Sequence, residues 1–334
     1  MIGHDLNLAG WIPFKVRAGD RSLRPVVDWC FLGADAFTDP FFEQTIERCW
    51  SKPFNQLLAH ETPIDDLLDW RAAQPGIAPT AFIFHGSRCG STLLARMAAA
   101  LPRTVVISEA PPVDHILRAR TTEATRIEWL RALLSALGQP RRGDERHLLV
   151  KFDAWHVIDL PLVQQAFPQV PCVFLYREPA ALMASQLRMP GIHILPGVLD
   201  PSLIGLDLPG VLRLDQDEYS GRILAAVYAA GLAHAAAGRV TLMNYSQLPS
   251  AAASQVLAWC GLAGSDDAAE RLREVARYDA KTPSLPFDAT DVSTRPHPNQ
   301  RAVDMAARFV DPYYARLESM RLGPSDRIVR PRAG

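Results

Sequence analysis

The segment AFIFHGSRCGSTLLARM, from Ala81 to Met97, constrains the fold more than any other part of the chain. It begins with apolar residues that suit a β-strand, continues through a turn with two glycines, and ends in residues that favour a helix. Gly86 and Gly90 allow a sharp turn and a close approach of the backbone to an anion. Ser91 and Thr92 open the helix, whose positive end faces the same point. The segment therefore predicts a loop that binds the phosphate of a group-transfer substrate.

The cation of this loop distinguishes it from the Walker A loop of ATP-binding proteins. In Walker A a lysine follows the last glycine and serves the β- and γ-phosphates. Here Gly90 is followed directly by Ser91, and the long cationic side chain is Arg88, inside the loop. A guanidinium in that position has an anion to bind, so we expect Arg88 to contact a phosphate. An ordinary pairing of Arg88 with a surface carboxylate is the alternative.

A second segment, PCVFLYREPAALMASQL from Pro171 to Leu187, has a similar organisation. It predicts a buried strand that ends at Arg177 and a helix that has Pro179 at its first position. Ser185 follows eight residues after Arg177. This spacing lets a guanidinium and a hydroxyl converge on one phosphate, with the arginine forming two parallel hydrogen bonds.

The two segments together resemble the donor-binding motifs of sulfotransferases that use 3′-phosphoadenosine 5′-phosphosulfate (PAPS), of the bacterial P-loop type. The family's 5′-phosphosulfate loop, [PS]-[RK]-[ST]-G-[TS]-[TS], is similar to residues 87–92, with Cys89 in place of a serine or threonine. The resemblance covers residues 80–265. It implies PAPS as co-substrate without a metal, Arg88 as the cation that stabilises the leaving phosphate, and these donor contacts: Gly86, Ser87, Arg88, Cys89, Gly90, Ser91, Thr92, Arg177, Ser185 and Tyr245.

Sulfuryl transfer also needs a base for the acceptor. Glu109 follows the second predicted strand, where many bacterial and tyrosylprotein sulfotransferases similarly have a glutamate base. Cytosolic sulfotransferases have the sequence Lys-Thr-His at the place where this chain has residues 151–153. Lys151 stands in the position of the lysine, and Asp153 stands in that of the histidine. The resemblance therefore implies Asp153 as the alternative base and Lys151 as a second cation on the leaving group. A buried carboxylate can have the raised pKa that general-base catalysis prefers. For the nearby His115 and His156 we expect structural hydrogen bonds instead.

Two further donor contacts are weaker in the sequence. Tyr245 ends a predicted strand where the family has Tyr-Glu-Asp-Leu, with the tyrosine near the adenine, but Ser246 and Gln247 replace the acids here. Stacking on a base and a place in the core are both open for Tyr245. The family's C-terminal basic contact has Arg295 and Arg301 as candidates, and ordinary surface charge is an equal alternative for both.

The pattern of apolar runs predicts an α/β fold, a P-loop type central parallel sheet flanked by helices. Residues 1–75 are predicted to form a mainly helical accessory or cap segment, with Gln74 to Thr80 as linker to a sulfotransferase-like domain over 76–334. Residues 195–217 are too long and irregular for a plain connection and suit an active-site lid or a surface excursion. The predicted strands are Ala81–Phe84, Thr104–Ser108, Leu148–Phe152, Cys172–Tyr176 and Val240–Tyr245, and the predicted helices include Trp129–Leu137, Arg222–Ala237 and Ser250–Trp259.

Composition agrees with a soluble cytoplasmic enzyme. The 334 residues carry a net charge of −1, which gives no basic footprint for nucleic acid or for a membrane surface. The five cysteines are scattered and lack C-x-x-C spacing, so neither a disulfide framework nor a zinc site is expected. We see no signal peptide and no membrane-spanning run. A small-molecule acceptor, with a hydroxyl or an amine, suits this charge better than a polyanionic glycan, whereas its identity and the oligomeric state stay open.

Two other classes of function remain possible on this scaffold. One is an ATP-dependent small-molecule kinase, in which Asp153 would hold Mg²⁺; the missing Walker lysine counts against it. The other is a non-catalytic interaction protein that has lost donor binding, against which Arg88, Arg177 and Ser185 argue.

Overall fold

A five-stranded sheet carries the predicted loop. The computed structural model describes residues 8–17, 25–287 and 297–323, and in it the strands have the order β5-β6-β4-β7-β8. The pairs β4–β6, β5–β6 and β7–β8 are parallel. The predicted α/β fold with a parallel sheet flanked by helices is therefore confirmed. The strands are β4 (Pro79–His85), β5 (Thr104–Ser108), β6 (His147–Lys151), β7 (Cys172–Tyr176) and β8 (Thr241–Asn244).

Continuous apolar runs explain why these segments form strands. All five residues of β7, CVFLY, are buried, as are the last five of β4. Strands of a parallel sheet have helices over both faces, so both of their side-chain rows must be apolar. Within this sheet the bounds predicted from sequence differ from those observed by one or two residues at most.

The chain divides into two compact units. The first comprises residues 1–83, 91–171 and 249–287, and the second comprises 84–90, 172–248 and 288–334. The predicted boundary near residue 75 is not one of these divisions and stays a prediction. The helices of the first unit are α1 (Phe42–Trp50), α2 (Pro53–Leu57), α3 (Ile64–Ala73), α4 (Ser91–Ala100), α5 (Pro111–Leu117), α6 (Glu123–Leu137), α7 (Leu160–Ala166), α11 (Ser250–Trp259) and α12 (Asp266–Val275).

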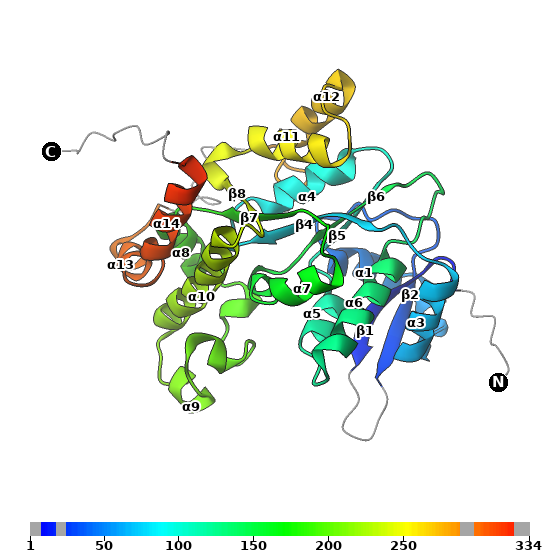
Figure 1. Cartoon of the computed structure of the whole chain (residues 1–334), viewed down its shortest axis with the longest axis horizontal. Helices are drawn as coiled ribbons and strands as arrows, with labels where there is room; N and C mark the ends of the chain where they lie inside the picture. Colours follow the sequence, from blue (N-terminus) through cyan, green and yellow to red (C-terminus); the bar gives the residue numbers. More distant parts are fainter. Residues whose placement is uncertain (1–7, 18–24, 288–296, 324–334) are drawn as a thin grey trace. The chain divides into compact units, whose positions relative to one another are not determined.

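The first 75 residues contain a sheet that the sequence analysis did not predict. Strands β1 (Trp11–Arg17), β2 (Val26–Phe31) and β3 (His60–Pro63) pair antiparallel in the order β1-β2-β3. Helix α3 packs on α6, and α5 packs on β1, so this sheet joins the helices of its own unit (Figure 1). The prediction of a mainly helical segment therefore holds for α1, α2 and α3 but missed the sheet beside them.

Helices of the second unit pack around the long helix α10. Both α13 and α14 contact α10, and α13 also contacts α8 (Figure 1). On α14, Glu318 accepts hydrogen bonds from the Tyr176 hydroxyl at the end of β7 and from the Asn244 amide at the end of β8. This network fixes the ends of both strands. The helices are α8 (Pro179–Arg188), α9 (Leu208–Val211), α10 (Gln216–Ala236), α13 (Gln300–Phe309) and α14 (Asp311–Leu322).

Residues 195–217, for which a lid or a surface excursion was predicted, consist of short helical turns. The 3₁₀ helix Pro201–Ile204 precedes α9 within this segment, and another, Ile192–Ile194, ends just before it. The side chain of Asp215 then caps α10 by accepting from the Glu218 N–H. No helix among the described residues combines the length and the apolar character needed to cross a bilayer.

Candidate functional site

The loop after β4 has a backbone shaped to hold an anion. Ser87 and Arg88 have φ values of 65° and 42°, and Gly90 has 86°, so three of four successive residues are left-handed. Runs of this kind turn backbone N–H groups toward one concave point that suits an anion. Left-handed non-glycine residues cost of order 1–3 kcal/mol each and cluster at functional sites. Helix α4 begins at the next residue, Ser91, as predicted.

Neighbouring side chains leave no room for a side chain at either glycine of the loop. A Cβ on Gly86 would lie 2.6 Å from a ring carbon of Tyr228, and one on Gly90 would lie 2.2 Å from the Leu248 side chain. Distances this short exclude any side chain unless the neighbour moves. The Gly86 N–H donates to the Leu175 carbonyl oxygen at 2.8 Å, which ties the start of the loop to β7.

Cys89, the departure from the family motif, is explained by its surroundings. The residue is completely buried, and its thiol donates to the Leu175 carbonyl oxygen at 3.3 Å. The side chain is thus turned to β7. The loop serine is held as well, because the Gln186 amide on α8 donates to the Ser87 hydroxyl oxygen at 2.8 Å. Gln186 was missed in the sequence, where no motif marks it.

Among the described residues, Arg88 has no carboxylate partner. Its guanidinium donates to the Met189 carbonyl oxygen at 2.5 Å, and among the described residues it forms no ion pair. Burial, together with the positive charge of Arg188, lowers the pKa of Arg88 below its usual value. The predicted alternative, a surface ion pair, is therefore not what the structure has. A half-buried guanidinium that contacts only a neutral carbonyl gains from an incoming anion.

Arg177 is positioned by two tyrosines. The Tyr228 hydroxyl bonds to the backbone N–H and carbonyl of Arg177, while the guanidinium lies 4.4 Å from the ring centre of Tyr245. The guanidinium also approaches the Arg88 carbonyl oxygen at 3.4 Å. Arg88, Arg177 and Tyr245 are thus brought together. Ser185 lies buried on α8, two turns after Pro179, which occupies the predicted first helical position.

In the first unit, Glu109 and Lys151 form an ion pair at the ends of β5 and β6. The Lys151 ammonium bonds the Glu109 carboxylate and lies 4.9 Å from the centre of the Phe41 ring. The lysine side chain is 1% exposed, so the pair is shielded from water on that side. Glu109 has a φ of 52°, the same left-handed strain as the loop residues. Its backbone N–H donates to the Lys151 carbonyl oxygen at 2.8 Å.

Asp153, the second candidate base, lies in the same cluster. Burial and the negative charge of Glu109 raise the pKa of Asp153 to about 7. The Asp153 N–H donates to Nδ1 of His156, so the proton of this imidazole is on Nε2, which donates to Asp114 at 2.8 Å. Burial opposes ionisation of Asp114, yet the hydrogen bonds from His156 and Trp155 hold its pKa at about 2. Asp114 was missed in the sequence.

The remaining candidates have other partners. His115 accepts a hydrogen bond from the Val16 N–H at 3.3 Å, and His156 bonds as above, so both have the structural hydrogen bonds expected of them. Arg301 pairs with Asp215, the N-cap of α10, and with Asp217 in the first turn of that helix, which balances its charge. Arg295 lies outside the described residues.

Comparison of the whole chain with known proteins returns sulfotransferase structures. No family model matches the sequence, and no curated protein matches it. The chain is similar to the sulfotransferase domain from the curacin biosynthetic pathway, with 16% identity over 70% of this chain and 97% of that one and a TM-score of 0.40. It is also similar to a sulfotransferase from Mycobacterium avium, with 12% identity over 75% and 81% of the two chains and a TM-score of 0.44.

A third similar structure is a retinol dehydratase in complex with androsterone and the inactive cofactor PAP. It shares 12% identity over 82% of this chain and 89% of that one, with a TM-score of 0.31. The solved structures that the chain resembles thus include sulfotransferases, the family whose donor-binding motifs the sequence resembles. These similarities concern the fold.

Proposed function

We propose that the protein is a PAPS-dependent sulfotransferase that transfers a sulfuryl group to a hydroxyl or an amine of a small-molecule acceptor. The observation that carries this proposal is the left-handed loop of residues 86–90, with the Arg88 guanidinium inside it and no carboxylate paired to that guanidinium among the described residues. Such a loop favours a phosphate, and the lack of a Walker lysine favours a donor other than ATP.

Donor binding is assigned to the loop after β4, to the first residues of α4 and to Arg177, Ser185 and Tyr245. The loop backbone suits the 5′-phosphosulfate, and Arg177, beside the loop, suits a second phosphate such as the 3′-phosphate of PAPS. Ser185 is proposed as the hydroxyl partner of Arg177. Tyr245 already stacks on the Arg177 guanidinium, and its ring is proposed to stack on the adenine as well. The positive charge and the concave backbone therefore fit a nucleotide with two anionic ends.

PAPS supplies the sulfuryl group and leaves as a bisphosphate. Since such transfers pass through a loose in-line transition state, the protein contributes mainly position and charge stabilisation. Arg88 is proposed to turn from the neutral Met189 carbonyl to the developing phosphate charge. Lys151 is proposed as a second cation.

Proton removal is assigned to the carboxylates of the first unit. Glu109 is the proposed base, supported by its strained backbone at the end of β5, which the protein maintains at a cost in stability. Asp153 is the alternative, supported by a pKa of about 7, which is suited to accepting a proton near neutral pH. Lys151, which pairs with Glu109, holds that carboxylate in place at the end of β5.

Isothermal titration tests the proposal directly. Adenosine 3′,5′-bisphosphate is titrated in the presence of a chelator, and ATP is titrated with Mg²⁺. Micromolar binding of the bisphosphate without metal is the expected result. Binding of ATP with Mg²⁺ alone would favour the kinase and overturn the proposal. If neither nucleotide binds, the result would favour a non-catalytic interaction protein.

A further inference from the structure

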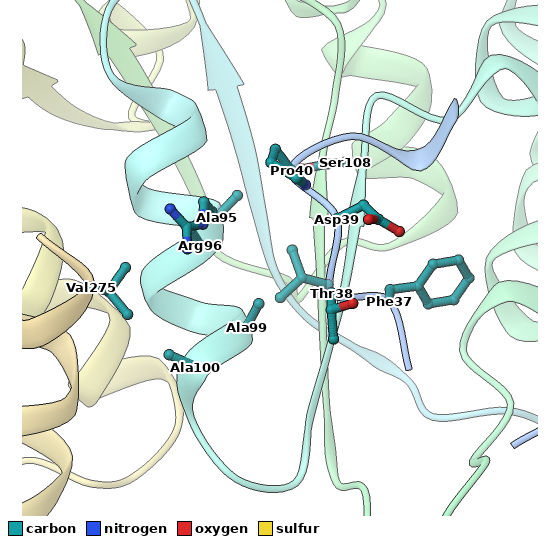
Figure 2. A pocket seen from close by; sticks show the side chains of 11 residues that line it. Phe37, Thr38, Asp39, Pro40, Ala95, Arg96, Ala99, Ala100, Ser108 and Val275 are labelled. Carbon is teal, nitrogen blue, oxygen red and sulfur yellow. The ribbon is translucent and has the colours of Figure 1, made fainter. Parts of the chain in front are cut away.

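A small cavity of about 140 Å³ lies in the first unit, between helix α4, the end of β5 and residues 37–40 (Figure 2). One wall is apolar and is formed by Ala95, Ala99, Val106 and Val275. An apolar cavity of roughly 150 Å³ accommodates a molecule of the size of benzene. The cavity therefore suits a short apolar group rather than a nucleotide.

Two polar side chains, Ser108 and Arg96, also line the cavity. Ser108 is 5% exposed, and its buried hydroxyl oxygen has no hydrogen-bond partner among the described residues. Arg96 donates to the backbone carbonyl of Asp279 at 3.0 Å and forms no ion pair within the described part of the chain. Burial lowers the pKa of Arg96 below its usual value, and the negative charge of Asp279 offsets part of that effect.

The carboxylate of Asp39 also lines the cavity, but its charge is already balanced. It accepts hydrogen bonds from the Thr45 hydroxyl at 2.7 Å and from the Arg48 guanidinium at 3.0 Å. Arg96 is the cationic side chain of the cavity lining, and among the described residues no carboxylate lies within 4.0 Å of its guanidinium. A ligand that uses both polar side chains therefore brings a negative charge to Arg96 and an acceptor for Ser108.

Two residues that line the cavity are chain neighbours of the cluster around Lys151. Ser108 is the register partner of Lys151 in the β5–β6 pair, and paired residues of neighbouring strands point to the same face of a sheet. Pro40 lines the cavity, and the next residue, Phe41, places its ring under the Lys151 ammonium. Two residues of the lining, Ser108 and Pro40, therefore immediately precede Glu109, the proposed base, and Phe41 in the chain.

We propose that this cavity binds the carboxylate end of a small acceptor, with Arg96 donating paired hydrogen bonds to the carboxylate and Ser108 donating a third. The apolar wall then contacts a short hydrocarbon or aromatic body. The carboxylate site stands on the cavity alone, whereas the statement that the carboxylate belongs to the acceptor rests on the proposed sulfotransferase function.

Binding of benzoate tests the site without turnover. Calorimetry or ligand-observed NMR compares benzoate with benzamide, which has nearly the same shape without the charge. We expect benzoate to bind about tenfold more tightly or better, since a charged pair distinguishes the two. Equal affinities would overturn the proposal. Tighter binding of inorganic phosphate than of benzoate would also overturn it, because the site would then be one for a simple anion.

Three variants locate the binding. Arg96→Gln should weaken benzoate about tenfold and leave benzamide unchanged. Ser108→Ala should weaken benzoate several-fold without lowering the melting temperature, because the free protein loses only an unpartnered hydroxyl. Arg71→Gln, which removes an exposed guanidinium paired with Glu128 on the same unit, is the control and should bind as wild type. Unchanged benzoate affinity in both cavity variants would place the ligand elsewhere and overturn the proposal.

Two further measurements separate this proposal from the sulfotransferase activity. Titration of adenosine 3′,5′-bisphosphate with each variant reports donor binding, which should not change. With labelled donor, para-hydroxybenzoate should have a kcat/KM about tenfold above that of its methyl ester, and Arg96→Gln should abolish the difference. Benzoate binding without bisphosphate binding would contradict the proposed function only; bisphosphate binding without benzoate binding would contradict the cavity proposal only.

Discussion

The hydroxyl of Tyr228 makes two hydrogen bonds with the backbone of Arg177, donating to its carbonyl oxygen at 2.7 Å and accepting from its N–H at 3.1 Å. Burial raises the pKa of this phenol well above its usual value, so the hydroxyl keeps its proton. The ring of the same tyrosine fills the space that a side chain at Gly86 would need. One buried residue therefore sets the end of β7 and the start of the loop together.

Tyr228→Phe should keep the ring contact with Gly86 while freeing the backbone of Arg177. Leaving buried backbone groups without a partner costs about 1–3 kcal/mol, so we expect a loss of that size in the free energy of unfolding. Bisphosphate affinity should fall as well. Denaturant unfolding and calorimetry measure the two effects, with Tyr219→Phe, another buried tyrosine of α10, as control. Unchanged affinity would mean that Tyr228 does not position the donor site.

Arg177→Ala should separate the two phosphates of the donor. Adenosine 3′,5′-bisphosphate should lose about tenfold or more in affinity, because a charged hydrogen bond is worth about 1.5–3 kcal/mol. Adenosine 5′-phosphosulfate, which has no 3′-phosphate, should lose much less. Calorimetry with both nucleotides measures the difference, and Arg213→Ala, at an exposed arginine of the same unit, controls for net charge. Equal losses for both nucleotides would remove the 3′-phosphate assignment.

Glu109→Gln should lower turnover by about 10² to 10⁴ with little change in bisphosphate affinity, because the amide keeps the shape and loses the basicity. Asp153→Asn should lower turnover less than Glu109→Gln does. The measurement is kcat with saturating labelled donor, followed by calorimetry of each variant. If the two results exchange places, Asp153 is the base. A loss of donor affinity with turnover retained in Glu109→Gln would give Glu109 a purely structural role.

The pKa values of two aspartates predict opposite effects of pH on stability. Asp153 has a pKa raised from 3.8 to about 7, so the folded state holds the proton more tightly and the charge costs stability as pH rises from about 4 to 7. Asp153→Asn should therefore become increasingly more stable than wild type over that range. Asp114 has a pKa lowered to about 2, so its ionised carboxylate stabilises the folded state above pH 4. This stabilisation is lost as the pH falls toward 2.

Unfolding free energies of wild type, Asp153→Asn and Asp114→Asn, measured from pH 2 to pH 8, check both signs. The loss of unfolding free energy caused by Asp114→Asn should have its full size above about pH 4 and should become smaller as the pH approaches 2. If the difference in unfolding free energy between wild type and Asp153→Asn does not change with pH, the carboxyl of Asp153 in the wild-type protein titrates normally.

Gly90→Ala should deform the loop for two reasons, the φ of 86° and the contact of the new Cβ with Leu248 at 2.2 Å. We expect an overpacking cost of about 1–3 kcal/mol and a loss of bisphosphate binding. Gly261→Ala has a similar φ with open space around it, so it reports the cost of φ alone. The double variant Gly90→Ala, Leu248→Ala should recover part of the loss. No recovery would mean that the contact with Leu248 is not what excludes a side chain.

Much of the central sheet could be predicted because each of its strands is a local apolar run bounded by turn residues. Helix α11 and the position of Pro179 could also be predicted, since their signals lie within a few residues. The antiparallel sheet could not: β3 is HETP, without a hydrophobic pattern, and it forms only because β2, about thirty residues earlier, supplies its partner. Tyr228 was likewise hidden, because nothing in an alanine-rich helix marks one tyrosine as the partner of Arg177.

Strand β6 lies between β5 and β4, although β4 and β5 are consecutive in the chain. During synthesis β4 and β5 are therefore made before either has a strand to pair with. Both can pair only after residues 147–151, which form β6, have been made. Contacts between segments so far apart in sequence form late, because the intervening chain must first be closed into a loop. We therefore expect the strands from β4 to β6 to pair together, and a chain interrupted within this stretch to have exposed strand edges open to other molecules.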